Sequence, residues 1–173
     1  MVASKRGFTL MELIMVVGIL SVLFAIGPRL LLQANREFIM IRAKMDLQRE
    51  ARAAMYTITR ALRQAHASTI VVSNVANQPY YSKIYFVKEQ EPGSLVTSTM
   101  TFQQEGTQLV QLMAGSASNR RVLTKNLNYL AFTFPRTDDM GIISVSLTLQ
   151  KNIYEGRTKA LHMASEKVRV MND

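Results

Sequence analysis

An apolar run near the amino terminus limits the folds open to this chain of 173 residues. From Leu13 to Ile26 the run is broken only by two small residues. Counted from Phe8 to Leu32 it has 25 residues, interrupted by Glu12 and Arg29. An α-helix needs roughly 20 apolar residues to cross a bilayer. The sequence therefore predicts a membrane-spanning helix that precedes one globular domain.

Basic residues before the run indicate its orientation. Lys5 and Arg6 hold the preceding end of the chain in the cytoplasm by the positive-inside bias, so the globular part is expected outside the inner membrane. The same layout resembles a secretory signal, with Ala25-Ile26-Gly27 as the cleavage site. Pro28 directly after that site argues against cleavage there, and we expect the apolar segment to stay.

The composition excludes several classes of chemistry. The chain has no cysteine, which rules out disulfides, a thiol nucleophile and Cys-ligated zinc or iron–sulfur centres. The formal net charge is +9, but the basic residues are spread along the chain and form no block of like charge. Most of them are therefore interpreted as solvated surface.

A second helical segment follows the apolar run. Gly27 and Pro28 predict a kink or a loosened turn, because proline lacks the backbone donor and crowds the preceding turn. Residues 35–67 then read as one amphipathic helix. Its apolar stripe recurs at intervals of three and four residues, through Ile41, Met45, Met55, Ile58, Leu62 and Ala65. We expect this stripe to pack under a sheet.

The carboxy-terminal half changes to β-branched and alternating residues. Gly106 with Thr107, and the segment 138–141, indicate hairpin turns. A long helix followed by a meandering antiparallel sheet is an α+β arrangement. The strand candidates are 68–75, 83–88, 99–104, 108–113, 128–134, 142–150 and 161–170.

Glu12 is the residue that a simple membrane anchor does not explain. An acidic side chain within a membrane helix costs roughly 2.5 to 3.5 kcal/mol, less near the interface, so it calls for a partner. An alternative is an interfacial glutamate that extends to the headgroups. Glu12 follows the segment Gly7-Phe8-Thr9-Leu10-Met11, which is preceded by basic residues and followed by the apolar run. This amino terminus resembles that of the type IV prepilins and pseudopilins.

The resemblance implies a processing step and an assembly role. A membrane-embedded prepilin peptidase would cut between Gly7 and Phe8 and methylate the new amino group of Phe8. In a bundle of such helices, the carboxylate of Glu12 in one subunit would pair with the Phe8 ammonium of another. The implied division is a leader peptide at 1–7, a transmembrane and filament-core helix at 8–33, an amphipathic helix at 34–67 and an antiparallel β-sheet region at 68–173. The implied fold is pilin-like, with the long helix packed on the sheet.

The order of segments also resembles minor subunits of this family. It is similar to the J-type minor pseudopilins of type II secretion systems and to the W-type minor pilins, which prime filaments. The implied partners are the prepilin peptidase, other pilin or pseudopilin subunits, the inner-membrane assembly platform and the inner membrane. The likeness involves residues 46–63, 128–134, 142–149 and 166–170.

The sequence contains no recognisable catalytic or metal-binding set. His66 and His162 lack a second histidine or a cysteine at ligand spacing. Asp138 and Asp139 could supply calcium ligands, but the run of oxygen ligands that a calcium loop needs is absent, and turn chemistry is favoured. No phosphate loop, nucleophile elbow or paired carboxylates appear. We therefore expect a protein that is not an enzyme and has no cofactor or metal.

Two alternatives belong to other functional classes. Arg120, Arg121 and Lys125 would form a basic patch that contacts DNA if the protein were a competence pilin. Isolated cations on a sheet are more often solubilising surface. A membrane-anchored extracytoplasmic binding protein or enzyme would need a polar pocket in the sheet, for which the sequence offers no residue set.

Overall fold

The structure is a computed structural model that describes residue 7 and residues 9–89, 97–114, 119–154 and 158–171. The chain divides into two compact units, Met1–Ile41 and Arg42–Asp173. One long helix followed by antiparallel sheets confirms the predicted α+β, pilin-like class.

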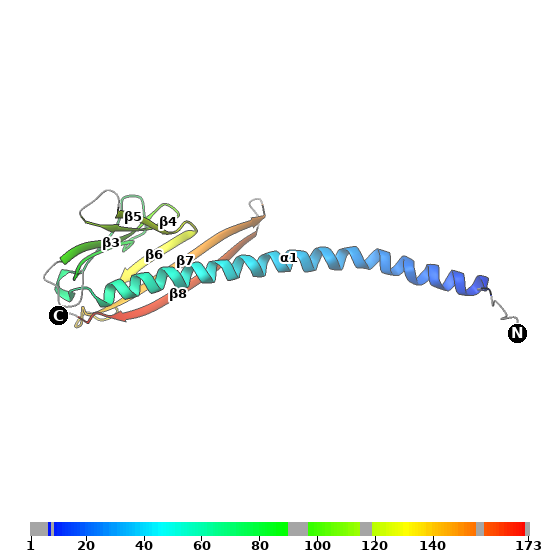
Figure 1. The fold of residues 1–173 in the computed structure, drawn as a ribbon, viewed down its shortest axis with the longest axis horizontal. Helices are drawn as coiled ribbons and strands as arrows, with labels where there is room; N and C mark the ends of the chain where they lie inside the picture. The colour runs from blue at the N-terminus through cyan, green and yellow to red at the C-terminus, as the bar shows by residue number, and fades with distance from the viewer. Residues whose placement is uncertain (1–6, 8, 90–96, 115–118, 155–157, 172–173) are drawn as a thin grey trace, which may run out of the picture. The chain divides into compact units, whose positions relative to one another are not determined.

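Helix α1 runs from Leu10 to Arg63 (Figure 1). It covers most of both segments that the sequence predicted as helical, and it remains α-helical through Gly27 and Pro28. A kink or local melting at Pro28 inside a filament stays a prediction. The helix ends at Arg63, before the predicted end at Ala67, because the backbone that follows hydrogen-bonds to strand β2. The His66 N–H donates to the Val87 carbonyl at 3.0 Å.

The second unit contains two antiparallel sheets where the sequence predicted one. The first has the order β1-β2-β3-β4-β5, and the second has the order β6-β7-β8. The hairpin between β3 and β4 turns at Gly106, whose φ of 60° suits a residue without a side chain. Their bounds are β1 Val71–Ser73, β2 Lys83–Glu89, β3 Thr97–Glu105, β4 Gln108–Met113, β5 Arg120–Thr124, β6 Leu127–Thr133, β7 Ile142–Tyr154 and β8 Thr158–Arg169.

Strand β5 is the element that the sequence analysis missed. Its first two residues, Arg120 and Arg121, led us to interpret the segment as basic surface. In the structure β5 pairs with β4, from Leu112 opposite Arg120 to Leu109 opposite Thr124. The other seven strands overlap their predicted ranges, and β4 matches its range at both ends. β1 is much shorter than predicted, because a short 3₁₀ helix occupies Ala67–Thr69.

The core of the second unit lies against one face of α1. Met55, Ile58, Leu62 and Ala65 are buried as the apolar stripe predicted. The prediction is wrong for Ile41 and Met45, which are 56% and 48% exposed. Near Ile41 and Met45, the buried positions of α1 are Ala43 and Leu47 instead. The buried residues of α1 are Ala43, Leu47, Ala51, Ala54, Met55, Ile58, Thr59, Ala61 and Leu62.

Strands of both sheets contribute to this core. Phe86 of β2 and Phe102 of β3 are fully buried, and their ring centroids lie 6.2 Å apart. Leu130 and Phe132 of β6 are also fully buried. Figure 1 shows β6, β7 and β8 lying along the part of α1 that follows Arg42. Each large apolar side chain buried here contributes about 1.5–3 kcal/mol relative to exposure.

A polar cluster on α1 fixes the passage from the first sheet to the second. The Thr124 hydroxyl donates to Glu50 Oε2 at 2.8 Å. Asn126 Nδ2 donates to Glu50 Oε1 at 3.1 Å and to Glu50 Oε2 at 2.9 Å. One turn earlier on the helix, Asp46 forms an ion pair with Lys151 of β7 at 3.3 Å. Glu50 therefore binds the connection between β5 and β6, where the chain leaves the first sheet and begins the second one.

Replacing Glu50 by alanine should lower the free energy of unfolding of the second unit by about 2 kcal/mol. The loss arises because the amide of Asn126 and the buried hydroxyl of Thr124 lose a charged acceptor. Urea unfolding of the full chain in detergent measures it, followed by tyrosine fluorescence, since the chain has no tryptophan and every tyrosine lies beyond residue 41. Arg49→Ala, on the exposed side, is the matched control and should shift stability by less than about 0.5 kcal/mol. Equal midpoints for the Glu50 variant and the wild type would contradict the assigned role.

Candidate functional site

The first turn of α1 holds the carboxylate that the sequence analysis singled out. The helix begins at Leu10, so Thr9 is the N-cap residue and Glu12 is the third helical residue. The Thr9 N–H donates to Glu12 Oε2 at 3.0 Å, and the Thr9 hydroxyl donates to the same oxygen at 3.2 Å. The Glu12 N–H donates to Thr9 Oγ1 at 3.3 Å. This reciprocal pattern is a capping box.

The capping box gives Glu12 a partner within its own chain. The Thr-x-x-Glu spacing of residues 9–12 indicates a capping box, whereas the partner expected from the sequence was in another subunit. A carboxylate in the first turn also lies near the positive end of the helix dipole. Both effects reduce the cost of a charge at the start of an apolar helix. No described residue donates to the other oxygen, Glu12 Oε1.

The processing residues lie just before this turn. Gly7 is exposed, and a Cβ built on it meets no heavy atom within 4 Å. Phe8, the expected first residue of the mature chain, lies outside the described residues, as do Lys5 and Arg6. The pairing of a Phe8 ammonium with Glu12 therefore stays a prediction.

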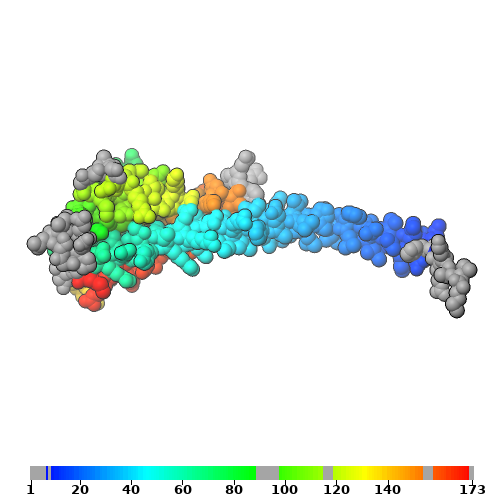
Figure 2. All heavy atoms as spheres, viewed as in Figure 1, coloured from blue at the N-terminus to red at the C-terminus, as the bar shows by residue number. Residues whose placement is uncertain are grey.

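The first part of α1 presents an apolar surface. No residue from Leu10 to Arg42 is buried, and the space-filling view shows these side chains at the surface (Figure 2). The helix is long and apolar enough to cross a membrane by length and composition, and none of its most apolar window is buried. The large exposed side chains include Leu10, Ile14, Val17, Leu20, Phe24 and Leu31. Such a surface is unfavourable in water, because exposing apolar side chains to water raises the free energy.

Comparison with known families identifies this segment. Residues 2–27 match the model of the prokaryotic N-terminal methylation motif. The amino terminus of the chain is therefore similar to that of type IV pilin-like proteins. The matched range includes Gly7, Thr9 and Glu12, so the capping box belongs to the same segment as the motif. The motif implies processing by a prepilin peptidase and assembly into pilin filaments, and the apolar helix suggests membrane anchoring. No curated protein and no solved structure matches the chain significantly.

The residues considered for DNA contact do not all lie on one face of the sheet. Arg120 and Arg121 are consecutive in β5, so their side chains leave opposite faces of the strand. Arg120 forms an ion pair with Glu105 at 2.8 Å, and this bond is the main reason that the pKa of Glu105 lies below its usual value. Lys125 follows the strand in the turn before β6. The charge of Arg120 is thus largely offset by a neighbour.

The other titratable candidates occupy structural positions. Asp138 forms an ion pair with Arg136 at 2.7 Å, and this bond lowers the pKa of the Asp138 carboxyl. Asp139 Oδ1 accepts the Gly141 N–H at 2.9 Å, which is a turn contact. His162 lies in β8. Among the described residues, no three His, Asp or Glu side chains are grouped so that they could hold a metal ion.

Proposed function

We propose that this protein is a minor pilin or pseudopilin, a non-enzymatic subunit that primes or caps a type IV pilus or a type II secretion pseudopilus. It would be inserted in the inner membrane with its amino end in the cytoplasm and its sheet unit in the periplasm. The peptidase would then cut after Gly7, and the assembly platform would move the subunit from the bilayer into the filament. The observation that carries the proposal is a methylation motif at the start of a helix whose first part, residues 10–42, has no buried side chain.

Two environments in turn would cover that apolar surface. In the bilayer, lipid tails surround the apolar run up to Leu32, and the Thr9 cap satisfies Glu12 Oε2. In a filament, helices of neighbouring subunits would replace the lipid. Since Glu12 Oε1 accepts no bond from any described residue, it is available to the methylated amino group of Phe8 in a neighbouring subunit. The carboxylate can then keep its cap and also pair between subunits.

The minor role is supported by the sequence likeness to J-type and W-type subunits. The likeness includes residues 46–63 of α1, 142–149 of β7 and 166–170 around the end of β8. A subunit that primes or caps a filament is needed in few copies, whereas the major subunit forms the shaft. The proposal therefore predicts a low copy number as well as a processed amino terminus.

Mass spectrometry of purified filaments should find a chain that begins at an N-methylated Phe8. The expected result follows from cleavage after Gly7 by the peptidase that the motif implies. Quantification in the same sample should place this chain far below the major subunit. An amino terminus at Met1 or at Pro28 would reject the processing step. Equal copy numbers of this chain and the major subunit would reject the minor role.

A further inference from the structure

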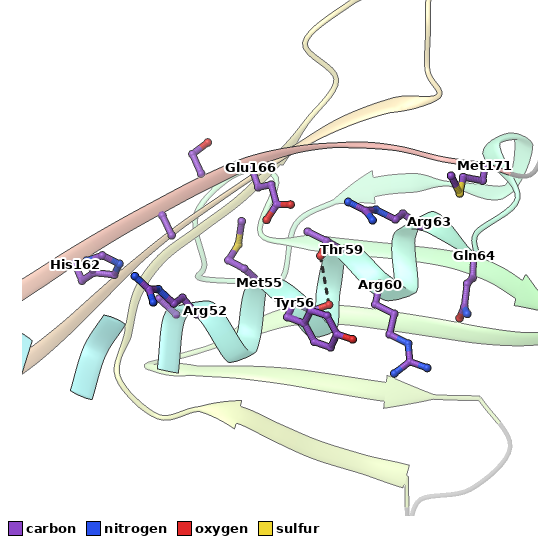
Figure 3. Close-up of a pocket in the computed structure, with 13 residues that line it drawn as sticks. Arg52, Met55, Tyr56, Thr59, Arg60, Arg63, Gln64, His162, Glu166 and Met171 are labelled. Atoms are coloured by element: carbon purple, nitrogen blue, oxygen red, sulfur yellow. Dashed lines mark hydrogen bonds between the residues drawn. The ribbon is translucent and has the colours of Figure 1, made fainter. Parts of the chain in front are cut away.

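A groove of about 610 Å³ separates α1 from strand β8 in the second unit (Figure 3). We call it the α1/β8 groove. Its helix wall includes Arg52, Tyr56 and Arg63, and its strand wall includes His162, Ala164 and Glu166. The helix residues fall on one stripe, because they are spaced at three to four residues or multiples of that spacing. Buried Ala51 and Met55 contribute apolar surface to the groove, so charge lies beside an apolar floor.

The backbone of β8 is available on the side away from β7. β8 is the last strand of its sheet, and no described strand pairs with its outer edge. The Val170 N–H donates to the Gly141 carbonyl, toward β7, so the backbone groups of Val168, Glu166, Ala164 and His162 point the same way. The intervening residues point outward, and they include Leu161, Met163 and Ser165.

The charge of the groove selects an acidic occupant. Arg52, Arg60 and Arg63 are exposed and form no ion pair with any described residue. Among the described residues that line the groove, Glu166 is the one carboxylate, so cations predominate there. A second copy of this chain is a poor occupant, because it would bring the same formal charge of +9. An acidic partner would complement the groove.

We propose that an extended acidic segment of a different filament subunit adds a strand to the free edge of β8 and places carboxylates in the α1/β8 groove. The identity of the partner as a filament subunit rests on the proposed function. Strand addition suits this surface because main-chain hydrogen bonds hold the segment, while alternate side chains enter the groove.

The spacing of the arginines sets the pattern of the segment. Arg52 and Arg63 are about 16 Å apart along the helix axis, at ~1.5 Å per residue. Residues i and i+4 of a strand lie on one face and are about 13 Å apart, at ~3.3 Å per residue. Arginine side chains are long enough to cover the difference. The fitting segment therefore carries acidic residues at i and i+4, with an apolar residue at i+2 beside Met55 and Tyr56.

A labelled synthetic peptide tests this pattern with the full chain in detergent. The peptide has 12 residues, the same number as β8. Threonine occupies every second position of the peptide, and the positions between them are glutamate, valine and glutamate in turn. Its binding is measured by fluorescence anisotropy. The peptide should bind, and a version with lysine in place of glutamate should not. Because this assay needs neither cleavage nor assembly, its failure is distinguishable from failure of the proposed function.

Charge reversal separates the groove from general attraction. Arg52→Glu with Arg63→Glu should weaken peptide binding about tenfold or more. Arg121→Glu with Lys125→Glu makes the same change in net charge on exposed residues away from the groove, and should change binding by less than about twofold. All four positions are exposed, and circular dichroism and thermal unfolding verify the fold. Equal losses in the two double variants would overturn the proposal.

Backbone methylation of the peptide tests strand pairing. N-methyl groups on one alternate set of residues should abolish binding, because those amides face β8, whereas the other set should leave it intact. Equal effects from the two sets would overturn strand addition. A DNA oligonucleotide is the second probe. If it bound more tightly than the peptide, and if the Arg52 and Arg63 double variant no longer bound it, the groove would be a nucleic-acid site and the proposal would be overturned. If the wild-type chain associated with itself and the Arg52 and Arg63 double variant did not, the occupant of the groove would be a second copy of the chain and the proposal would be wrong.

Discussion

Replacing Glu12 by glutamine should leave membrane insertion intact and reduce incorporation into filaments about tenfold or more. Glutamine keeps the side-chain oxygen that accepts the Thr9 N–H, because either residue can serve in a capping box. It removes the negative charge that would pair with the Phe8 ammonium of a neighbour. A unit charge pair at about 4 Å contributes roughly 4 kcal/mol at an effective dielectric constant near 20, before desolvation is subtracted. The measurement is the ratio of filament-bound to membrane-bound subunit.

Two further variants separate the charge from the cap. Thr9→Val removes the hydroxyl that binds Glu12 and keeps the carboxylate, so incorporation should fall by only a few-fold, as loss of one N-cap predicts. Glu12→Ala removes both functions and should show the largest loss. If the glutamine variant matched wild type while Thr9→Val matched Glu12→Ala, the carboxylate would act as a helix cap and the proposed pairing between subunits would be wrong.

This experiment also bears on the peptidase step. The substitutions leave Gly7 and Phe8 unchanged, so cleavage should continue and the mature amino terminus should still appear. Loss of cleavage in the glutamine variant would mean that the peptidase recognises Glu12. The incorporation defect of that variant would then result from failed cleavage and not from a lost charge pair. Mass spectrometry of the membrane fraction distinguishes the two cases.

Local patterns predicted most of the elements, because helices and strands depend on residue periodicity. The three- and four-residue spacing from Met55 to Ala65 identifies the buried face of α1, and alternation identifies β4 to the residue. Strand β5 escaped detection because its first two residues are arginines, whose charge obscures alternation at a sheet edge. Pairing with β4, a tertiary contact, is what makes this segment a strand.

The rest of the architecture depends on contacts between distant residues. The chain passes from the first sheet to the second where Glu50 binds Thr124 and Asn126, across more than 70 residues of chain. The spacing between α1 and β8, and hence the α1/β8 groove, is likewise set by packing and has no local pattern. The capping box at Thr9 and Glu12 differs from these features, since its four-residue signal was present in the sequence.

Leu47→Ala should destabilise the second unit by about 3 kcal/mol. Leu47 is 0% exposed, and truncating a buried leucine removes transfer free energy and leaves a cavity. Urea unfolding of the full chain in detergent, followed by tyrosine fluorescence, measures the change. Filament incorporation should fall only to the extent that the unfolded fraction rises.

Leu31→Ala is the matched control, because it makes the same change on the same helix in the first unit. Leu31 is 73% exposed, so its truncation should alter the unfolding free energy of the second unit by less than about 0.5 kcal/mol. Incorporation should nevertheless decrease several-fold, since neighbouring helices in a filament would bury this side chain and gain about 1.5–3 kcal/mol from it. The two leucines therefore dissociate stability from assembly. If Leu31→Ala were incorporated normally, the apolar surface of the first unit would be a membrane anchor alone and the filament role would lose its structural basis.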